Sequence, residues 1–464
     1  MAETNTPRQI KFGAILTGTG GPGDQLRWLD PEIPGDASVD IDWYIEYARL
    51  AEQAKFDLVF IVDSQFITPN SPPHYLNRLE PLTLLSALAV ATDRIGLVGT
   101  ATTSYNSPYN LARRFASLDL ISHGRAGWNV VTSGDAGTSR NYGLDEHFDY
   151  PTRYRRAAEH IQASQALWDS YEDDAFPRDR DTRVFLDPEK LHDTDHHGEF
   201  FDIAGPLNIQ RSPQGQPVIF QAGDSNDGRD LGGRHAEGIF THASTIEAGI
   251  AFRQDIRGRA AAAGRDPENV LILPGARIFV GDTDEEARAL ERAAHQQSNS
   301  FDIALAELGR PFGWHDFTVH DLDAPFPDVL HLAQRSFRTN AEHIVAFAKK
   351  DSLTLRQVVE RLSAFHPSPF VGSPTTVADR LQEWFEAGAV DGFNVYVAQP
   401  AQFRRLLRDV IPILQARGLH RTEYEGTTLR EHLGLPVPQN RHTTAASAQS
   451  VASAVDADQL ATIS

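Results

Sequence analysis

Eight short apolar runs, each followed by a helical pattern, constrain the fold of this chain more than any other feature. An alternation of strand and helix that continues over most of a chain is typical of an α/β protein. We expect strands at residues 10–16, 58–62, 95–100, 127–132, 218–222, 238–241, 270–280 and 392–397. We expect helices at residues 40–55, 81–92, 108–121, 153–171, 246–263, 284–295, 375–387 and 402–417. Eight such units predict a (β/α)8 TIM barrel with insertions between its elements.

The rival fold is an open doubly wound sheet, which would need a nucleotide-binding loop after its first strand. Gly18-Thr-Gly20-Gly-Pro-Gly23 follows the first strand and matches G-x-G-x-x-G. That motif binds a pyrophosphate only if a helix begins at its last glycine. The following residues contain Pro31 and Pro34, which break a helix there. We therefore favour a simple exit from the strand into a loop, and the barrel over the open sheet.

Two long interruptions divide the barrel pattern. Residues 172–216 are polar and acidic, and residues 297–373 carry extra helical segments. Barrels often place insertions above the C-terminal strand ends, so we expect both to cover the active site. We assign residues 1–442 to one barrel domain. Residues 443–464 form a low-complexity tail, which we expect to be disordered or to serve as an arm on a neighbouring subunit.

The charge and composition exclude several functional classes. The chain has 464 residues, a formal net charge of −20 and no cysteine. The negative charge argues against nucleic acid or an anionic membrane as the main partner. The lack of cysteine excludes disulfides and thiolate nucleophiles. With no signal peptide and no apolar run long enough to span a membrane, we expect a cytoplasmic protein.

Polar residues at the strand ends are the candidates for function, because barrel active sites lie there. Asp63 closes the second strand and is a helix cap, a structural acceptor or a ligand contact. Thr103 closes the third, in a row of hydroxyls that caps the next helix or binds a planar ligand. Asn129 and Ser133 share one face of the fourth strand. Tyr150 and Tyr154 share a helix face, where the simplest interpretation is a cover for the barrel rim.

A further candidate follows the fifth strand, where Gly223-Asp-Ser225-Asn-Asp-Gly228 leads into a helix. Backbone amides and the Ser225 hydroxyl can form an anion site there, although a plain helix cap explains Ser225 equally well. Arg229 can add positive charge. His196 and His197 suggest metal ligands, but adjacent histidines in an acidic segment are more often a solvated loop, and we expect no metal.

Several of these segments together resemble the bacterial-luciferase-like flavin monooxygenases. The strongest match is Ser122-His-Gly-Arg-Ala-Gly-Trp-Asn-Val-Val-Thr-Ser133, followed by Arg140-Asn-Tyr-Gly143. Pro217-Val-Ile-Phe-Gln-Ala-Gly223 and Val371-Gly-Ser-Pro-Thr-Thr-Val-Ala-Asp379 also match, and the resemblance covers about residues 8–435. The subgroup is that of nitrilotriacetate monooxygenase component A and dibenzothiophene-sulfone monooxygenase.

This resemblance implies an enzyme that uses reduced FMN, supplied by a separate NAD(P)H:flavin reductase, and O2 to oxidise or cleave a small organic substrate. The implied flavin contacts are Asp63, Thr103, Tyr150, Tyr154 and Ser225, with Ser225 at the phosphate. Many relatives carry a histidine at the position of Tyr150. A homodimer or higher homo-oligomer is also implied. No catalytic residue is assigned, because the cofactor performs the oxidation and the protein supplies a dry pocket.

Relatives also carry one or two histidines in the loop after the first strand, where this chain has Gly20-Gly-Pro-Gly23. We expect these glycines to widen the mouth for a bulky substrate. Two alternative functions remain. One is different chemistry on the same fold, either reduced-flavin cleavage of a heterocycle such as riboflavin or deazaflavin-dependent hydride transfer. The other is a flavin-binding protein without catalysis.

Overall fold

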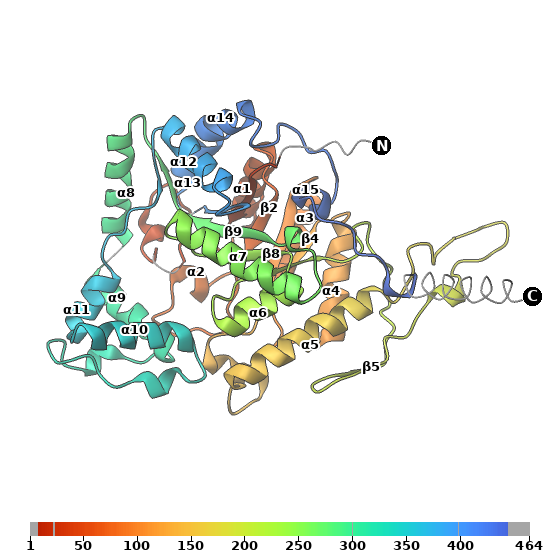
Figure 1. Cartoon of the computed structure of the whole chain (residues 1–464), viewed down its shortest axis with the longest axis horizontal. Helices are drawn as coiled ribbons and strands as arrows, with labels where there is room; N and C mark the ends of the chain where they lie inside the picture. Colours follow the sequence, from red (N-terminus) through yellow and green to blue (C-terminus); the bar gives the residue numbers. More distant parts are fainter. Residues whose placement is uncertain (1–7, 22–23, 299, 398, 444–464) are drawn as a thin grey trace, which may run out of the picture.

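The computed structural model describes residues 8–21, 24–298, 300–397 and 399–443. Eight parallel strands close into a barrel in chain order, and the last pairs with the first. They are β1 Lys11–Ile15, β2 Leu58–Ile61, β3 Gly96–Thr102, β4 Ala126–Val131, β7 Val218–Gln221, β8 Gly238–Thr241, β9 Leu271–Ala276 and β12 Gly392–Tyr396. All eight expected strands are present, and the TIM barrel is confirmed (Figure 1).

One expected strand, residues 270–280, is divided in two. β9 belongs to the barrel, whereas β10 (Ile278–Val280) leaves it and pairs in parallel with β11 (Phe370–Gly372). Arg277 lies between the two strands. This split places a charged residue at the tip of a barrel strand, where periodicity alone predicted the middle of an apolar run.

The α-helices of the described residues are α1 Ile41–Gln53, α2 Pro73–Leu76, α3 Pro81–Ala91, α4 Pro108–Ile121, α5 Tyr150–Trp168, α6 Asn226–His235, α7 Ile246–Ala262, α8 Asp284–Ser298, α9 Phe301–Leu308, α10 Arg338–Lys350, α11 Leu355–Leu362, α12 Pro374–Glu386, α13 Pro400–Arg405, α14 Ile411–Ala416 and α15 Leu429–Leu433. Most of the helices surround the barrel, while α9, α10 and α11 form a separate lobe and α15 closes one end. The helix expected at 402–417 is interrupted by a π-helical turn at Leu406–Val410. Pro412 follows it and lacks the N–H that a continuous α-helix needs.

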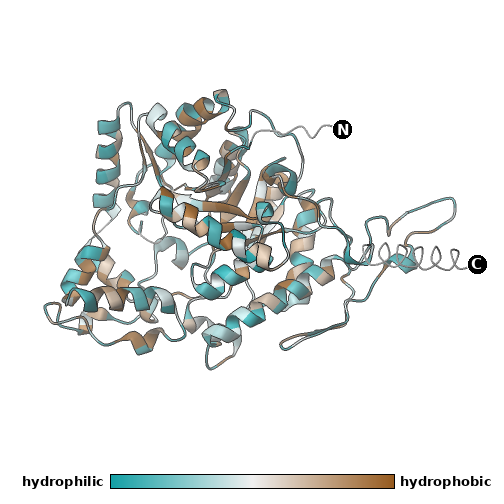
Figure 2. Cartoon of the chain, viewed as in Figure 1, coloured by the Kyte–Doolittle hydropathy of each residue, from teal (hydrophilic) through white to brown (hydrophobic). Residues whose placement is uncertain are grey.

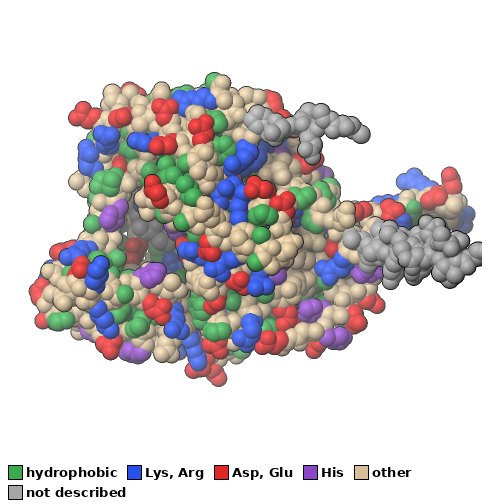
Figure 3. Space-filling view, in the orientation of Figure 1, with side chains coloured by type: hydrophobic (Ala, Val, Ile, Leu, Met, Phe, Trp, Pro, Cys, Tyr) green, Lys and Arg blue, Asp and Glu red, His purple; other side chains and the backbone are tan. Residues whose placement is uncertain are grey.

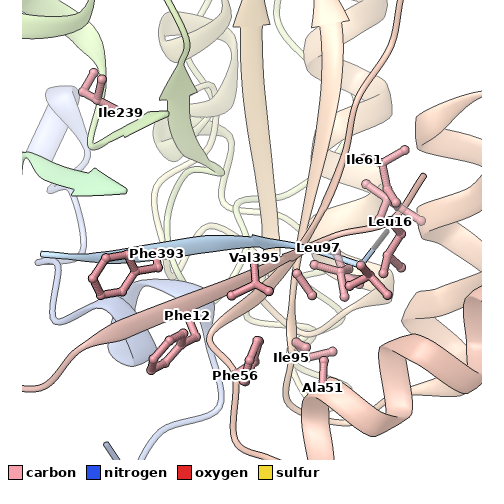
Figure 4. Close-up of a cluster of buried hydrophobic side chains, with 14 of the residues drawn as sticks. Phe12, Leu16, Ala51, Phe56, Ile61, Ile95, Leu97, Ile239, Phe393 and Val395 are labelled. Atoms are coloured by element: carbon pink, nitrogen blue, oxygen red, sulfur yellow. The ribbon is translucent and has the colours of Figure 1, made fainter. Parts of the chain in front are cut away.

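Two apolar layers hold the barrel together. The outer layer packs the strands against the helices, and Phe12, Phe56 and Phe393 belong to it (Figure 4). The inner layer fills the barrel with Phe60, Phe220 and their neighbours. Leu429 and Leu433 of α15 join this inner layer and close the N-terminal end of the barrel. The strands are accordingly the brown centre of Figure 2. The C-terminal end of the barrel is therefore the open one.

The two long interruptions lie in different places. Residues 172–216 follow α5 and precede β7, and hold a small hairpin of β5 (His196–His197) and β6 (Asp202–Ile203). A connection from helix to strand lies at the N-terminal end of the barrel, and these residues line neither cavity described below. The expectation that this segment covers the active site is therefore wrong.

The second interruption does reach the mouth. It contains α9, α10 and α11, which form a helical lobe beside the barrel with an apolar cluster of its own around Leu305, Phe312 and Ile344 (Figure 1). Figure 3 shows a hollow between this lobe and the barrel. Of the expected tail at 443–464, all but Thr443 lies outside the described residues. In the part of the chain that is described, no helix combines the length and the apolar character that a membrane span requires.

Candidate active site

A cavity of about 950 Å³ opens at the C-terminal ends of β2, β3, β4, β7 and β8. This volume is within the range of small-molecule and cofactor sites. Four of the five predicted contacts, Asp63, Tyr150, Tyr154 and Ser225, line its wall. They come from three separate segments of the chain, and the barrel alone brings them together. The helical lobe completes the wall with Arg310, Ser336, Phe337, Arg338, Thr339, Asn340 and His343.

A candidate anion site lies at one end of this cavity, at the N-terminus of α6. The Ser225 hydroxyl accepts the Gly228 N–H at 3.1 Å and caps the helix. The Tyr154 hydroxyl lies 3.4 Å from the Ser225 hydroxyl. A Cβ at Gly223 would approach Gly228 Cα to 2.9 Å, so the tight loop requires glycine. Free amides, the helix dipole and two hydroxyls therefore meet at a point suited to a phosphate.

The predicted Arg229 is only partly available to such an anion. Its guanidinium donates to the Asp224 carbonyl at 2.9 Å and pairs with Asp255 at 3.1 Å. Tyr150 and Tyr154 pack together with ring centroids 5.0 Å apart. Burial, reinforced by Tyr150, raises the pKa of Tyr154 far above its usual value. Tyr154 is thus a neutral hydroxyl donor at physiological pH.

Asp63 lies at the opposite side of the cavity, just beyond β2. Its carboxylate forms an ion pair with Arg78 at 3.1 Å. Burial raises the pKa of Asp63, and the positive charge of Arg78 opposes that rise. Arg78 also donates to the Ser64 carbonyl and packs over the ring of Tyr75. The carboxylate is therefore held in a fixed position, as a polar anchor for a ligand requires.

Thr103 is not among the residues that line the cavity. Its side chain is fully buried and donates to the Val131 carbonyl at 3.2 Å. Thr100 and Thr102, which the sequence reasoning missed, line the cavity instead. Strand alternation contained the signal, because Val98 fills the barrel interior and the positions two and four residues later share its face.

The shared face of Asn129 and Ser133 is confirmed. Asn129 donates to the Thr100 hydroxyl at 2.9 Å, and Ser133 donates to the Thr102 hydroxyl at 2.8 Å. These hydrogen bonds from the neighbouring segment therefore fix the orientation of the Thr100 and Thr102 hydroxyls. Such support fixes polar groups in the mouth that would otherwise be costly to bury.

A second cavity of about 480 Å³ adjoins the first across the mouth. His242 and Arg310 line both. The ends of β1, β2, β8 and β12 and the residue Arg277 form its wall, together with Gly21 from the glycine loop. The described residues 24–40 form turns and a short 3-10 helix, Arg27–Leu29, without an α-helix, so the loop does not have the form of a dinucleotide motif.

The loop of the second cavity is fastened to α2. His74 Nδ1 lies 2.8 Å from the Ser38 hydroxyl, which in turn bonds the Thr19 hydroxyl at 2.8 Å. The His74 amide also donates to the Gly20 carbonyl.

Away from the mouth, His196 pairs with Glu159, and His197 with Asp195 and Asp202. Among the described residues, no group of three or more His, Asp or Glu side chains could hold a metal ion.

These features define a barrel enzyme with a cofactor-sized cavity beside a smaller one. The family model described as luciferase-like monooxygenase matches residues 26–391. N-acetyl-S-(2-succino)cysteine monooxygenase of Bacillus subtilis (strain 168) is 43% identical over 441 residues, which cover 95% of this chain and 99% of the relative. Nitrilotriacetate monooxygenase component A of Aminobacter aminovorans is 42% identical over 428 residues, covering 89% and 94%. The chain belongs to the luciferase-like monooxygenase family.

Solved structures agree with this assignment. Riboflavin lyase, solved with modified FMN and the substrate riboflavin, has a TM-score of 0.82 at 32% identity, covering 94% of this chain and 98% of the other. Long-chain alkane monooxygenase has a TM-score of 0.80 at 30% identity, covering 92% and 96%. The resemblance stated from the sequence is confirmed, and the protein is a flavin-dependent oxidoreductase of the monooxygenase type.

Proposed function

We propose that the protein is the oxygenase of a two-component system. It would take reduced FMN from a separate NAD(P)H:flavin reductase and transfer one atom of O2 to a small organic substrate. The second oxygen atom leaves as water, and FMN is released oxidised. The observation that carries the proposal is the meeting of Ser225, Tyr154 and the α6 amides at one end of a 950 Å³ cavity.

The residues of this cavity fit FMN from end to end. The α6 amides, the Ser225 hydroxyl and Tyr154 would hold the phosphate. Asp63, fixed by Arg78, and Thr100 and Thr102 on β3 would contact polar edges of the ring system. When bound, reduced FMN supplies the electrons that activate O2. The protein orients the cofactor, and the lobe around Phe337 limits access of water.

The names of some relatives support a two-component arrangement. One is named component A, and pristinamycin IIA synthase of Streptomyces pristinaespiralis has relatives of this chain in its subunits A and B. The riboflavin lyase structure supports one other candidate, the reduced-flavin-dependent cleavage of a bulky heterocycle. Both reactions would place the substrate in the second cavity, next to the cofactor.

The test is to mix the protein, loaded anaerobically with reduced FMN, with oxygenated buffer. We expect a transient absorption distinct from those of oxidised and reduced FMN when no substrate is added. A subsequent substrate screen under 18O2 should place one labelled atom in the product. Reoxidation at the rate of free FMN would instead indicate simple storage and refute the proposal. Selective binding of a deazaflavin would refute it in favour of hydride transfer.

A further inference from the structure

The second cavity contains three arginines that differ in how their charge is balanced. Arg27 makes a two-pronged ion pair with Asp24, with N···O distances of 2.7–2.9 Å. Arg310 lies 3.7 Å from Asp135 and packs over the rings of Tyr75 and Phe337. Arg277 lies on the wall of the same cavity. In the described part of the chain it pairs with no carboxylate, and its guanidinium lies 5.9 Å from the ring centroid of Tyr396.

The groups around Arg277 balance its charge only in part. Glu291 also lines the cavity, but its carboxylate accepts the Ser368 N–H at 2.6 Å. Burial raises the pKa of Glu291, and the positive charge of Arg277 opposes that rise. Burial also lowers the pKa of His242 and of His295, and Arg277 lowers both further. Arg277 therefore lies near one carboxylate that a backbone amide already occupies, and near two histidines whose pKa values are shifted toward the neutral form.

A donor that can assist Arg277 lies beside it. Burial raises the pKa of Tyr396 to about 12, so its hydroxyl keeps its proton at physiological pH. Both side chains reach the mouth from neighbouring strands, since β9 pairs with β12 in parallel. A guanidinium fork next to a neutral hydroxyl offers two or three donors to a planar anion such as a carboxylate.

Part of the cavity wall is apolar, beside polar side chains such as Gln399 and Gln402. Ile15, Val62, Phe240, Val395 and Phe403 lie on its wall and can cover a carbon skeleton. This positive charge is also local, because the chain as a whole carries a net charge of −20. A positive group in a partly enclosed pocket of an acidic protein concentrates small anions there.

We propose that Arg277 anchors a carboxylate of the substrate, so that the substrate class is an organic acid whose carbon skeleton lies against the apolar wall. This inference rests on the proposed function, in which the first cavity holds FMN and the second holds the substrate. Tyr396 is the assisting donor. The bound carboxylate fixes the remaining skeleton toward His242, where the two cavities meet.

The probe is tricarballylate, a flexible tricarboxylate, with its uncharged trimethyl ester as the matched ligand. Calorimetric titration into the FMN-loaded protein should show binding of the acid, weakened roughly tenfold to hundredfold in R277Q. R277K should bind with intermediate affinity, because it keeps the charge and loses the fork. R113Q removes an exposed arginine of α4 that lines neither cavity, and should bind like the unchanged protein.

The same variants separate this inference from the proposed function. FMN and riboflavin are titrated into each protein, and R277Q should bind both as the unchanged protein does. If R277Q instead lost FMN affinity but kept riboflavin affinity, Arg277 would be a phosphate ligand and the inference would be overturned. Equal binding of the acid to R277Q and the unchanged protein would also overturn it. A protein that binds the acid through Arg277 but binds no FMN would refute only the proposed function.

Discussion

The two cavities at the barrel mouth are lined by different kinds of groups. The first is walled by hydroxyls, a helix N-terminus and a fixed carboxylate, and its arginines are largely occupied by protein partners. The second is smaller, its wall mixes apolar with polar side chains, and it contains Arg277, which pairs with no carboxylate in the described part of the chain. The first suits one ligand with a phosphate at one end, whereas the second suits variable carbon skeletons. A barrel can thus keep its cofactor while its substrate changes.

Loss of the phosphate site should produce the largest change in ligand affinity, and this change should affect only the first cavity. In S225D, aspartate still caps α6, so the fold is retained, but its charge lies where the phosphate would bind. At a separation near 4 Å, like charges in a partly buried site weaken binding of FMN by roughly hundredfold or more. Fluorescence titration should show this loss for FMN and little change for riboflavin, which has no phosphate.

The control for this variant is S107D, which makes the same change at the cap of α4, away from both cavities. It should bind FMN normally. Equal weakening of FMN and riboflavin binding in S225D would contradict the phosphate assignment.

Acid should weaken the loop of the second cavity through His74. Burial, with Arg78, lowers the pKa of His74 to about 3, below the value of 6.5 expected when unfolded. Because the unfolded chain binds a proton at His74 more readily than the folded chain does, the free energy of unfolding is highest above pH 6.5. It decreases as pH falls from 6.5 toward 3. Between pH 6.5 and 5 the loss is about 2 kcal/mol.

This loss is measured as the free energy of unfolding in urea at pH 7 and pH 5. H74N, which cannot titrate, should lose less stability over that interval than the unchanged protein. An identical loss in both proteins would show that His74 does not contribute to the pH dependence.

A larger side chain in the second cavity should hinder substrate binding there and leave FMN binding in the first cavity unchanged. A Cβ at Gly21 would meet Thr17 atoms only at 3.8 Å or more, so G21L can be accommodated and fills space in the cavity. For a substrate found by screening, KM should rise about tenfold, since overpacking of a fitted site costs 1–3 kcal/mol. FMN affinity should be unchanged. G258L, at an open position of α7, is the control and should leave both quantities unaltered.

Removal of the Tyr154 hydroxyl should produce the smallest effect. Y154F keeps the ring packing against Tyr150 and loses one neutral donor at the phosphate end. FMN affinity should fall about fivefold, the usual value of one hydrogen bond of this kind. Binding of tricarballylate in the second cavity should not change. A fall in acid binding, with FMN affinity intact, would show that the Tyr154 hydroxyl contacts the ligand of the second cavity and not the phosphate in the first.

Local signals in the sequence were sufficient for most of the barrel. The strands are continuous apolar runs because both of their faces are buried, which is visible without an alignment. Ser225 as a helix cap and the orientation of Asn129 and Ser133 toward the same side also follow from local rules. Thr103 was named from the resemblance, whereas Thr100 and Thr102, which share the face of Val98, line the cavity.

The sequence by itself determined the eight βα units and predicted that the functional residues lie at the strand tips. Only the tertiary structure decided that residues 172–216 lie away from the mouth while the helical lobe lies over it. Likewise, it placed His242, Arg277 and Tyr396, which are distant in sequence, around one cavity. The physical reason is that strand and helix patterns arise from contacts between near neighbours. The meeting of side chains across a barrel depends instead on closure, register and the path of long loops.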